Sequence, residues 1–371
     1  MSQRLLNFCA AVVLASALAA SPAQACTTFL LQGAGALYFG RNLDWFWEDG
    51  IVVINPRDMQ KAAFVLPGNG NTPAKWSARY GSVTFNQFGR EMPFGGMNEA
   101  GLVVENMWLD ETEYAEADSR PAVNLLQWIQ YQLDTCKTVT EVISNDSKIR
   151  IESPPVSAKS LARIHYLVCD ANGDSATIEF LKGGTVVHRG ETLPFRALAN
   201  DTYDNSAAYA RAHAMPEKLP ARLKDVSSFS RFTCAATRAQ RFRSVGPEKD
   251  VQYAFETLDQ VADGKFTVWS IVYDVAGKKI QFKTRAQSEV RVLDLNKLDF
   301  ACGLGARFVD IEAKPVEGKF SFQELSETRQ RQLLGGFLAK PSVKEKVGDL
   351  TMLMELQLMT LQGYKCPSVE R

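Results

Sequence analysis

Histidine, the most common general base in hydrolases, is scarce in this sequence, so catalysis would have to use another group. The three histidines are His165, His188 and His213. His165 and His188 fall within expected strands, where a structural role is more common than catalysis or metal binding. The sequence has no GxxxxGK[ST], GxSxG or HExxH motif and no CxxC pair, which argues against a P-loop, a nucleophile elbow and the common zinc sites. Hydrolysis would therefore need a base of a different kind.

Cys26 can supply both a nucleophile and a base if it is the first residue of the mature chain. Residues 1–25 have the features of a secretory signal: Arg4 near the start, a mostly apolar run over residues 5–20, and small residues before a cleavage site after Ala25. A free α-amine has a pKa near 7.7–8 and can accept the proton of its own thiol. The thiolate would attack a carbonyl group, and the amine would then protonate the leaving group.

An exported lipoprotein-like or catalytically inactive binding module is the alternative interpretation of an N-terminal cysteine. The lipoprotein processing box prefers leucine or a similar apolar residue three positions before the cleavage site, where this chain has Ala23. The apolar run is also shorter than the roughly 20 residues that span a bilayer. The expected location is therefore the periplasm or the exterior, with no membrane anchor after processing.

Arg41 and Asp44 are the charged residues best placed to act on Cys26. They belong to the stretch GRNLDW, which follows an expected hairpin and can return towards the start of the mature chain. A guanidinium near the sulfur would favour the thiolate, and a carboxylate near the α-amine would orient it. A surface ion pair at a strand end is the alternative role for these two residues.

The overall composition narrows the class of protein. The 371 residues include 42 Lys+Arg and 42 Asp+Glu, so no basic excess exists to hold nucleic acid by bulk charge. With 46% hydrophobic and 23% charged residues, the chain is also unlike a disordered one. We therefore expect a globular protein that does not bind nucleic acid.

Hydrophobic patterns predict strands first, helices in the middle, then strands again. Expected hairpins join residues 27–31 to 37–39, 164–169 to 177–181, and 266–275 to 279–285. Expected helices cover residues 207–214, 232–242 and 251–262, and two helical patterns separated by Pro341 follow residue 322. This order predicts an α+β protein of antiparallel sheets covered by helices. Because we find no linker, residues 26–371 are expected to form one domain.

Export permits disulfides, and the expected mature chain keeps six cysteines. Cys302 and Cys366 are the pair to test first. Cys136, Cys169 and Cys234 are expected to be small buried residues.

Five short motifs, in order, resemble the choloylglycine hydrolase family, which includes bile salt hydrolases and penicillin V acylases. They are Cys26-Thr27-Thr28, Gly40-Arg41-Asn42-Leu43-Asp44-Trp45, Gly96-Met97-Asn98-Glu99-Ala100-Gly101-Leu102, Leu198-Ala199-Asn200-Asp201 and Ser230-Arg231-Phe232. The resemblance spans most of the mature chain. It implies a four-layer αββα sandwich of the N-terminal-nucleophile hydrolase type.

The resemblance also implies roles for individual side chains. Cys26 would be the nucleophile and, through its amine, the general base, with Arg41 and Asp44 beside it. Asn200 would donate its side-chain amide to the oxyanion, and Arg231 would complete the polar cluster. A backbone N–H near Trp108 would be the second oxyanion donor.

Aromatic side chains are implied to line the acyl pocket, although an ordinary core is the alternative for them. These residues are Trp45, Phe46 and Trp108. Trp108 stands where bile salt hydrolases of the gut type carry asparagine, and this difference resembles the Gram-negative branch of the family. In that branch, penicillin V and acyl-homoserine lactones are cleaved alongside bile salts.

The expected reaction is hydrolysis of a linear amide bond in an N-acyl compound, through a thioester on Cys26. The substrate class is penicillin V-like, acyl-homoserine lactone or conjugated bile salt. No metal and no organic cofactor are implied, and the family resemblance allows a homotetramer.

Overall fold

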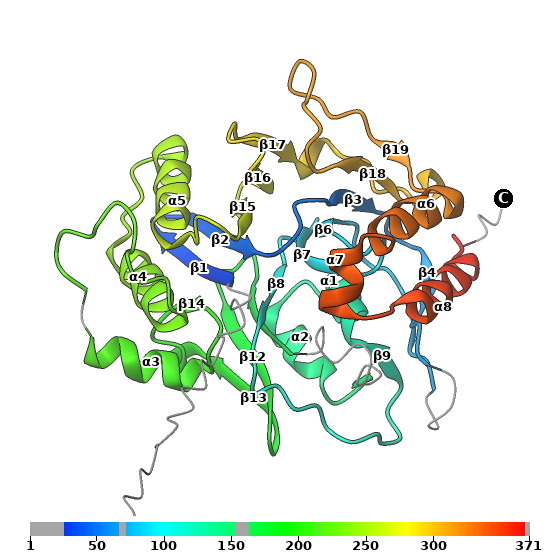
Figure 1. The fold of residues 1–371 in the computed structure, drawn as a ribbon, viewed down its shortest axis with the longest axis horizontal. Coiled ribbons are helices and arrows are strands. Elements are labelled where there is room, and N and C mark those ends of the chain that lie inside the picture. Colours follow the sequence, from blue (N-terminus) through cyan, green and yellow to red (C-terminus); the bar gives the residue numbers. More distant parts are fainter. Residues whose placement is uncertain (1–25, 67–71, 153–162, 214, 368–371) are drawn as a thin grey trace, which may run out of the picture.

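Two antiparallel sheets stack face to face at the centre of the computed structural model, which describes residues 26–66, 72–152, 163–213 and 215–367. Helices cover the outer face of each sheet, and Figure 1 shows the resulting four layers side by side. This is the αββα sandwich that the family resemblance implies. The predicted signal segment, residues 1–25, lies outside the described residues.

The first sheet has six strands and carries the start of the expected mature chain. In spatial order its strands are β14 (Ala197–Leu198), β1 (Cys26–Gly33), β2 (Ala36–Asp44), β15 (Thr267–Asp274), β16 (Lys279–Thr284) and β17 (Arg291–Asp294). The β1–β2 hairpin was predicted from its alternating pattern, and Gly35 in its turn has a φ of 81°, a conformation that glycine adopts readily. Most of β1 is buried because a helix covers one face of the sheet and the second sheet the other.

The second sheet has nine strands. In spatial order they are β13 (Gly184–Arg189), β12 (Ser175–Leu181), β11 (Ile164–Cys169), β8 (Val103–Trp108), β7 (Pro93–Asn98), β6 (Ser82–Asn86), β3 (Ile51–Asn55), β18 (Arg307–Asp310) and β19 (Gln323–Glu324). Two small two-stranded sheets lie beside it. They pair β4 (Gln60–Ala62) with β5 (Lys75–Ser77), and β9 (Ala122–Asn124) with β10 (Arg150–Glu152).

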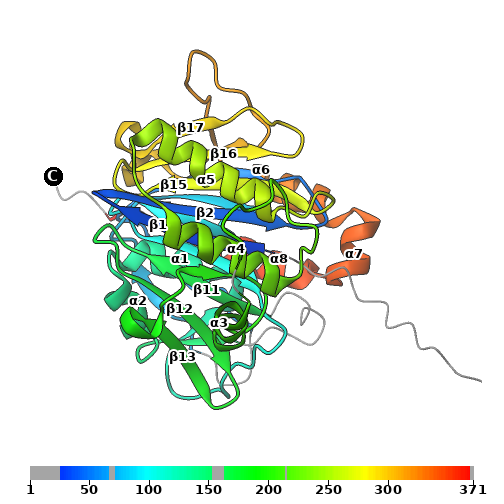
Figure 2. The same ribbon diagram turned by 90° about the vertical axis from the view of Figure 1, so that its left-hand side faces the viewer.

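Five helices form the two outer layers, and the turned view in Figure 2 shows one of these layers in front of the six-stranded sheet. That layer consists of α3 (Tyr203–Ala212), α4 (Ser228–Arg241) and α5 (Pro247–Val261), of which α4 packs on β1 and α5 on β2. The opposite layer consists of α1 (Trp128–Thr135) and α2 (Val139–Asn145), with α1 packed on β7. The three helices predicted in the middle of the chain correspond to α3, α4 and α5.

The C-terminal region differs from the prediction of two helical segments, because it forms three helices. They are α6 (Glu327–Leu338), α7 (Pro341–Val347) and α8 (Thr351–Gln362). Proline is favoured in the first turn of a helix, and Pro341 starts α7, while Gly348, with a φ of 81°, ends it. The three helices gather on one side of the sheets (Figure 1).

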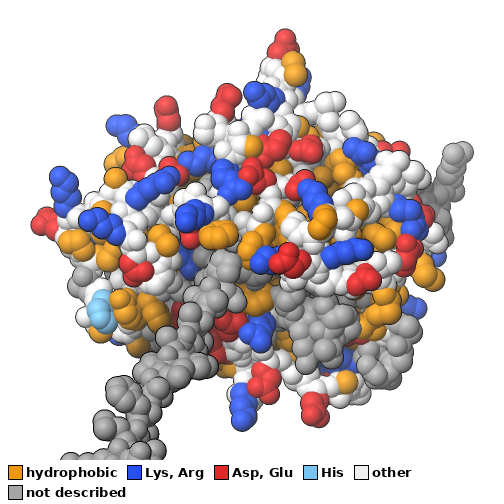
Figure 3. Space-filling model, viewed as in Figure 1, with side chains coloured by type: hydrophobic (Ala, Val, Ile, Leu, Met, Phe, Trp, Pro, Cys, Tyr) orange, Lys and Arg blue, Asp and Glu red, His pale blue; other side chains and the backbone are white. Residues whose placement is uncertain are grey.

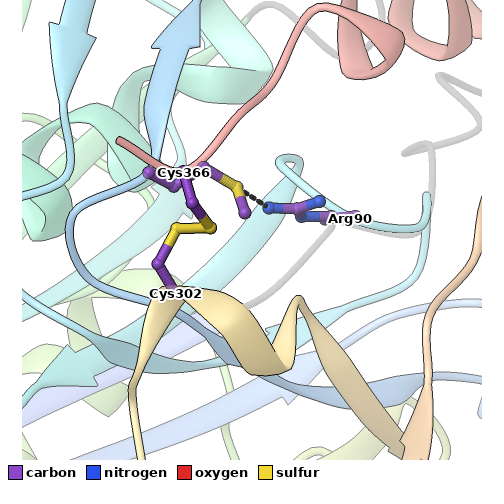
Figure 4. Close-up of a disulfide and its surroundings, with 4 residues drawn as sticks. Arg90, Cys302 and Cys366 are labelled. Carbon is purple, nitrogen blue, oxygen red and sulfur yellow. Dashed lines mark hydrogen bonds between the residues drawn. A yellow bond between two sulfur atoms is a disulfide. The ribbon is translucent and has the colours of Figure 1, made fainter. Parts of the chain in front are cut away.

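A disulfide joins Cys302 to Cys366 and fixes the end of the C-terminal region to the body of the domain (Figure 4). The Cα atoms are 5.7 Å apart, which is ordinary for a disulfide. This confirms the pair chosen from the sequence. Cys136, Cys169 and Cys234 are free and buried, as predicted.

Acidic and basic side chains are intermingled over the face shown in Figure 3. This agrees with the equal numbers of the two charge types in the sequence. Across the described ranges, no helix combines the length and the apolar character needed to cross a membrane.

Candidate active site

Cys26 is the first residue of β1, and the hairpin places it beside the end of β2. In the antiparallel register, Cys26 lies opposite Leu43 and Thr28 lies opposite Arg41. Side chains alternate between the faces of a strand, so Arg41 and Cys26 share one face of the sheet. The GRNLDW stretch therefore returns to Cys26 as the sequence predicted.

The guanidinium of Arg41 lies next to the sulfur of Cys26. Its Nη2 atom is 3.8 Å from Cys26 Sγ and donates a hydrogen bond to the carbonyl oxygen of Asn106 at 3.0 Å. Its Nε atom is 2.5 Å from Oε2 of Glu105. The hydroxyl of Tyr273 donates a hydrogen bond to the other oxygen of Glu105. Arg41 is thus held between a fixed carboxylate and the thiol.

Burial and nearby charges act in opposite directions on the groups of this cluster. Burial raises the pKa of the Cys26 thiol, while the charge of Arg41 works to lower it. Burial also raises the pKa of Glu105 to about 7, although Arg41 opposes this shift. Burial alone would lower the pKa of Arg41, but the charge of Glu105 keeps it above its ordinary value. Arg41 is therefore a permanent cation beside the buried thiol, and its charge opposes the rise in the thiol pKa that burial causes.

The side-chain amide of Asn200 links Cys26 to Arg231 and to Trp108. Its Oδ1 atom accepts hydrogen bonds from the backbone nitrogen of Cys26 at 2.8 Å and from Nη2 of Arg231 at 2.7 Å. Its Nδ2 atom donates to the carbonyl oxygen of Trp108 at 2.9 Å. Arg231, from the first turns of α4, also donates to the carbonyl oxygen of Cys26 and to the hydroxyl of Thr27. These bonds fix the amide plane of Asn200 next to Cys26.

Asp44 ends β2 and is fully buried. Burial raises the pKa of its carboxyl to about 7, against the opposing charge of Arg231 and a hydrogen bond from the hydroxyl of Thr267. The negative charge of Asp44 acts on the nearby Cys26 thiol and raises the pKa of that thiol. The structure thus brings together all five residues predicted for the polar cluster: Cys26, Arg41, Asp44, Asn200 and Arg231.

A largely apolar pocket of about 500 Å³, part of which is open to solvent, reaches the thiol of Cys26. Trp45 and Trp108 line it, as predicted for the acyl pocket. Phe46 does not line this pocket. Its ring instead packs against Trp45, with 5.6 Å between ring centroids, and against Phe266. Phe46 therefore belongs to an aromatic cluster beside the pocket and not to the pocket wall.

Several residues of the site had no motif to identify them. Glu105 and Tyr273 hold Arg41, and a set of mainly apolar side chains completes the pocket wall. That wall also contains Leu43, Phe88, Met92, Pro93, Phe94, Asn106, Met107, Leu126, Arg163 and Ile164. The neighbouring GMNEAGL motif could have drawn attention to Glu105, since Glu105 lies three residues beyond that motif, in the strand that follows it.

His165 has the structural role that the sequence favoured. It is buried in β11, its Nε2 atom lies 2.8 Å from the carbonyl oxygen of Ala199, and its Nδ1 atom lies 2.9 Å from Oε1 of Glu179. Ala199 directly precedes Asn200, so the ring supports the backbone that carries the amide. In the described parts of the chain, no three His, Cys, Asp or Glu side chains are grouped so that they could hold a metal ion.

Comparison with known proteins places this site in a family. Residues 26–304 match the model of the linear amide C–N hydrolases, choloylglycine hydrolase family. A penicillin V acylase from Pectobacterium atrosepticum is 29% identical over 335 residues, which cover 79% of this chain and 87% of that protein.

Solved structures of two related enzymes have a similar fold. The penicillin V acylase of Agrobacterium tumefaciens superposes with a TM-score of 0.68 at 25% identity, covering 81% of this chain and 98% of that one. A mutant of the conjugated bile acid hydrolase of Clostridium perfringens superposes with a TM-score of 0.61 at 15% identity, covering 81% and 100%. The second likeness concerns the fold alone.

Proposed function

Because the chain belongs to the choloylglycine hydrolase family of linear amide C–N hydrolases, we propose that it cleaves N-acyl amides with Cys26 as the nucleophile. One observation carries this proposal: the thiol of Cys26 meets an apolar pocket on one side and the guanidinium of Arg41, at 3.8 Å, on the other. The family match also begins at residue 26.

The first half of the reaction forms a thioester. The α-amine of a processed Cys26 takes the thiol proton, and the sulfur attacks the carbonyl carbon of the amide. As the C–S bond forms, negative charge develops on the carbonyl oxygen. The amide of Asn200 has a second hydrogen that Trp108 does not use, and it can donate that hydrogen to the oxyanion. The C–N bond then breaks, and the amine leaves with the proton from Cys26.

The second half releases the acid. A water molecule gives its proton to the same α-amine and attacks the thioester carbon. The C–S bond breaks, the carboxylic acid departs, and the proton returns to the sulfur. Arg41 stabilises the thiolate whenever it is the leaving group or the nucleophile.

Removal of residues 1–25 would be the activating step. In the unprocessed chain the Cys26 nitrogen is a peptide N–H that donates to Asn200 Oδ1. A peptide nitrogen cannot accept the thiol proton, so only a free amine supplies the base. We propose that this removal accompanies export to the periplasm or the exterior.

Trp45, Trp108 and the other apolar side chains of the pocket suit the acyl half of the substrate. Penicillin V-like amides, acyl-homoserine lactones and conjugated bile salts are the candidates, since relatives are named as penicillin V acylases and a conjugated bile acid hydrolase. The homotetramer allowed by the family resemblance stays a prediction, which sedimentation analysis of the processed protein can test.

The test combines the mass of the mature protein with turnover. Intact mass should show a chain that starts at an unmodified Cys26, and phenoxyacetyl-penicillin, acyl-homoserine lactones and conjugated bile salts are assayed in parallel. The Cys26→Ser variant should lose activity by a factor of about a thousand or more. Cys234→Ser, which alters another buried free thiol, is the matched control and should retain it.

Two outcomes would contradict the proposal. A diacylglyceryl group on Cys26 with a blocked amine would favour the lipoprotein-like binding module. A Cys26→Ser protein that turns over substrate at the native rate would exclude the nucleophile assigned here.

A further inference from the structure

The connection between β6 and β7, residues 87–92, forms part of the pocket of the candidate active site. Phe88 and Met92, which belong to this connection, line the pocket. Connections between strands usually run over the surface of a protein, but every residue of this one is buried. Because water does not reach the backbone N–H and C=O groups of a buried segment, these groups need partners within the protein.

Two helices of the C-terminal region supply such partners, and both act on Arg90. Oε1 of Gln330, in α6, accepts a hydrogen bond from the backbone N–H of Arg90 at 3.0 Å. The side-chain amide of Gln357, in α8, donates a hydrogen bond to the carbonyl oxygen of Arg90. Gln330 is 1% exposed, and Gln357 is fully buried. The peptide groups on both sides of Arg90 are therefore held by side chains from segments more than 200 residues away.

The backbone of this connection has a conformation that needs support. Glu91 has a φ of 69°, which is uncommon for a residue with a side chain and persists only where the surroundings hold it. Its carboxylate is 2.9 Å from Nζ of Lys61 and 3.4 Å from the hydroxyl of Tyr364. Gly89 has a φ of 77°, and a side chain at this position would collide with the amide of Gln330. Without its partners in the C-terminal region, the connection is therefore expected to take another conformation.

We propose that Gln330 and Gln357 are positioning residues of the acyl pocket. They hold residues 87–92 in the conformation that places Phe88 and Met92 against the acyl group of the substrate, and they thereby influence which acyl groups are accepted. This inference rests on the proposed function. Neither glutamine lines the pocket, and both lie beyond residue 304, where the family match ends.

Gln330→Met and Gln357→Met are the variants that test the proposal. Methionine is unbranched and close to glutamine in length, so each change keeps the packing and removes the hydrogen bond to Arg90. Hydrogen–deuterium exchange measures how firmly the connection is held. In both variants, the amides of residues 87–92 should exchange about tenfold faster or more, because the connection opens more often. Thermal melting sets the temperature at which each variant is still folded.

The kinetic measurement compares the acetyl and phenoxyacetyl amides of one chromogenic amine. A phenoxyacetyl group makes more contact with the pocket wall than an acetyl group does, so a displaced wall affects it more. In both variants, KM for the phenoxyacetyl amide should rise about fivefold, whereas kcat should change less than about twofold, because the residues of the polar cluster are unaltered. The ratio of phenoxyacetyl to acetyl kcat/KM should therefore fall about threefold or more. A role in stability alone would leave this ratio at the wild-type value in the folded protein.

Gln332→Met and Gln362→Met are the matched controls, because they alter exposed glutamines of α6 and α8. Both should keep the wild-type exchange rates and the wild-type ratio. Unchanged exchange in residues 87–92 of the Gln330→Met and Gln357→Met proteins would overturn the inference. Faster exchange with an unchanged ratio would overturn it as well, since the connection would then not shape the pocket.

Binding of phenoxyacetate, followed by tryptophan fluorescence, separates this inference from the proposed function. Trp45 and Trp108 line the pocket and serve as the probes. If the wild type hydrolyses neither amide but binds phenoxyacetate, and the Gln330→Met and Gln357→Met proteins bind it about fivefold more weakly, the catalytic assignment is wrong and the positioning role stands. If the wild type neither hydrolyses the amides nor binds phenoxyacetate, both assignments fail.

Discussion

Glu105 lies directly behind Arg41, and the two side chains form an ion pair in which each is only 1% exposed. The carboxylate lies against Nε of the guanidinium. The Nη2 atom remains free to face the sulfur of Cys26, at a distance of 3.8 Å. Tyr273 fixes the carboxylate in turn. The position of the cation at the nucleophile is therefore set by a residue that does not touch the nucleophile itself.

Glu105→Gln should weaken both the fold and the reaction. Above about pH 7, where Glu105 is ionised, the change leaves the buried charge of Arg41 without its counter-charge, and losing one partner of a buried pair costs about 3 kcal/mol. A less firmly held guanidinium lowers the thiol pKa less, so kcat/KM should fall at least about tenfold, and the rising limb of its pH profile should move to higher pH. Chemical denaturation and the pH profile measure the two effects.

Glu256→Gln is the control for that variant, since Glu256 pairs with Arg238 near the surface, with 52% of its side chain exposed. Its effect on activity should be negligible. A Glu105→Gln protein that loses stability but keeps the wild-type pH profile would show that Glu105 only supports the fold.

The free energy of unfolding of the unprocessed chain should fall as pH rises from about 5 to about 7. Burial raises the pKa of Asp44 and of Glu105 to about 7, from ordinary values of 3.8 and 4.5. In this window the folded chain holds protons on both groups, and the unfolded chain does not. Stability therefore decreases with pH, by up to about 1.4 kcal/mol per pH unit for each proton.

Urea denaturation at a series of pH values measures this slope. The double variant Asp44→Asn, Glu105→Gln has neither carboxyl, so its slope over the same window should be flatter. Equal slopes for the two proteins would mean that both carboxylates are ionised in the fold well below neutral pH.

Asn200→Ala should reduce kcat/KM by a factor of about a hundred, because one preorganised oxyanion donor is worth about 3 kcal/mol in the transition state. The change also removes the acceptor that holds the Cys26 nitrogen and Arg231. Steady-state kinetics on a short acyl amide gives the loss, and melting separates it from unfolding. Asn205→Ala, at an exposed position at the start of α3, is the control. An Asn200→Ala loss below threefold would remove Asn200 from the oxyanion site.

Local patterns predicted antiparallel sheets covered by helices and pointed to Cys26, Arg41 and Asp44, while the family resemblance supplied the four-layer arrangement, Asn200 and Arg231. Strand and hairpin patterns are local, and the cluster residues lie in short motifs. Glu105 was not predicted, because a buried acid in a strand can be recognised only when its partner, Arg41 on the facing sheet, is known. Phe46 follows the end of β2 in an irregular segment, so its position in the sequence could not show that its ring packs against Trp45 and Phe266 outside the pocket wall. The packing of α6 and α8 near Phe88 and Met92 joins segments more than 200 residues apart, which local patterns cannot reveal.

Removing the disulfide should separate the role of the C-terminal helices from that of the catalytic residues. Cys302 and Cys366 are 64 residues apart, and closing a loop of this length stabilises a fold by about 4 kcal/mol in the chain-entropy estimate. The double variant Cys302→Ala, Cys366→Ala should melt earlier, and reductant should lower the melting temperature of the wild type but not of the variant. Because the polar cluster lies within residues 26–304, kcat/KM measured below the melting temperature of the variant should stay close to that of the wild type. A variant that is still folded but whose kcat/KM falls tenfold would show that the disulfide also positions the catalytic residues.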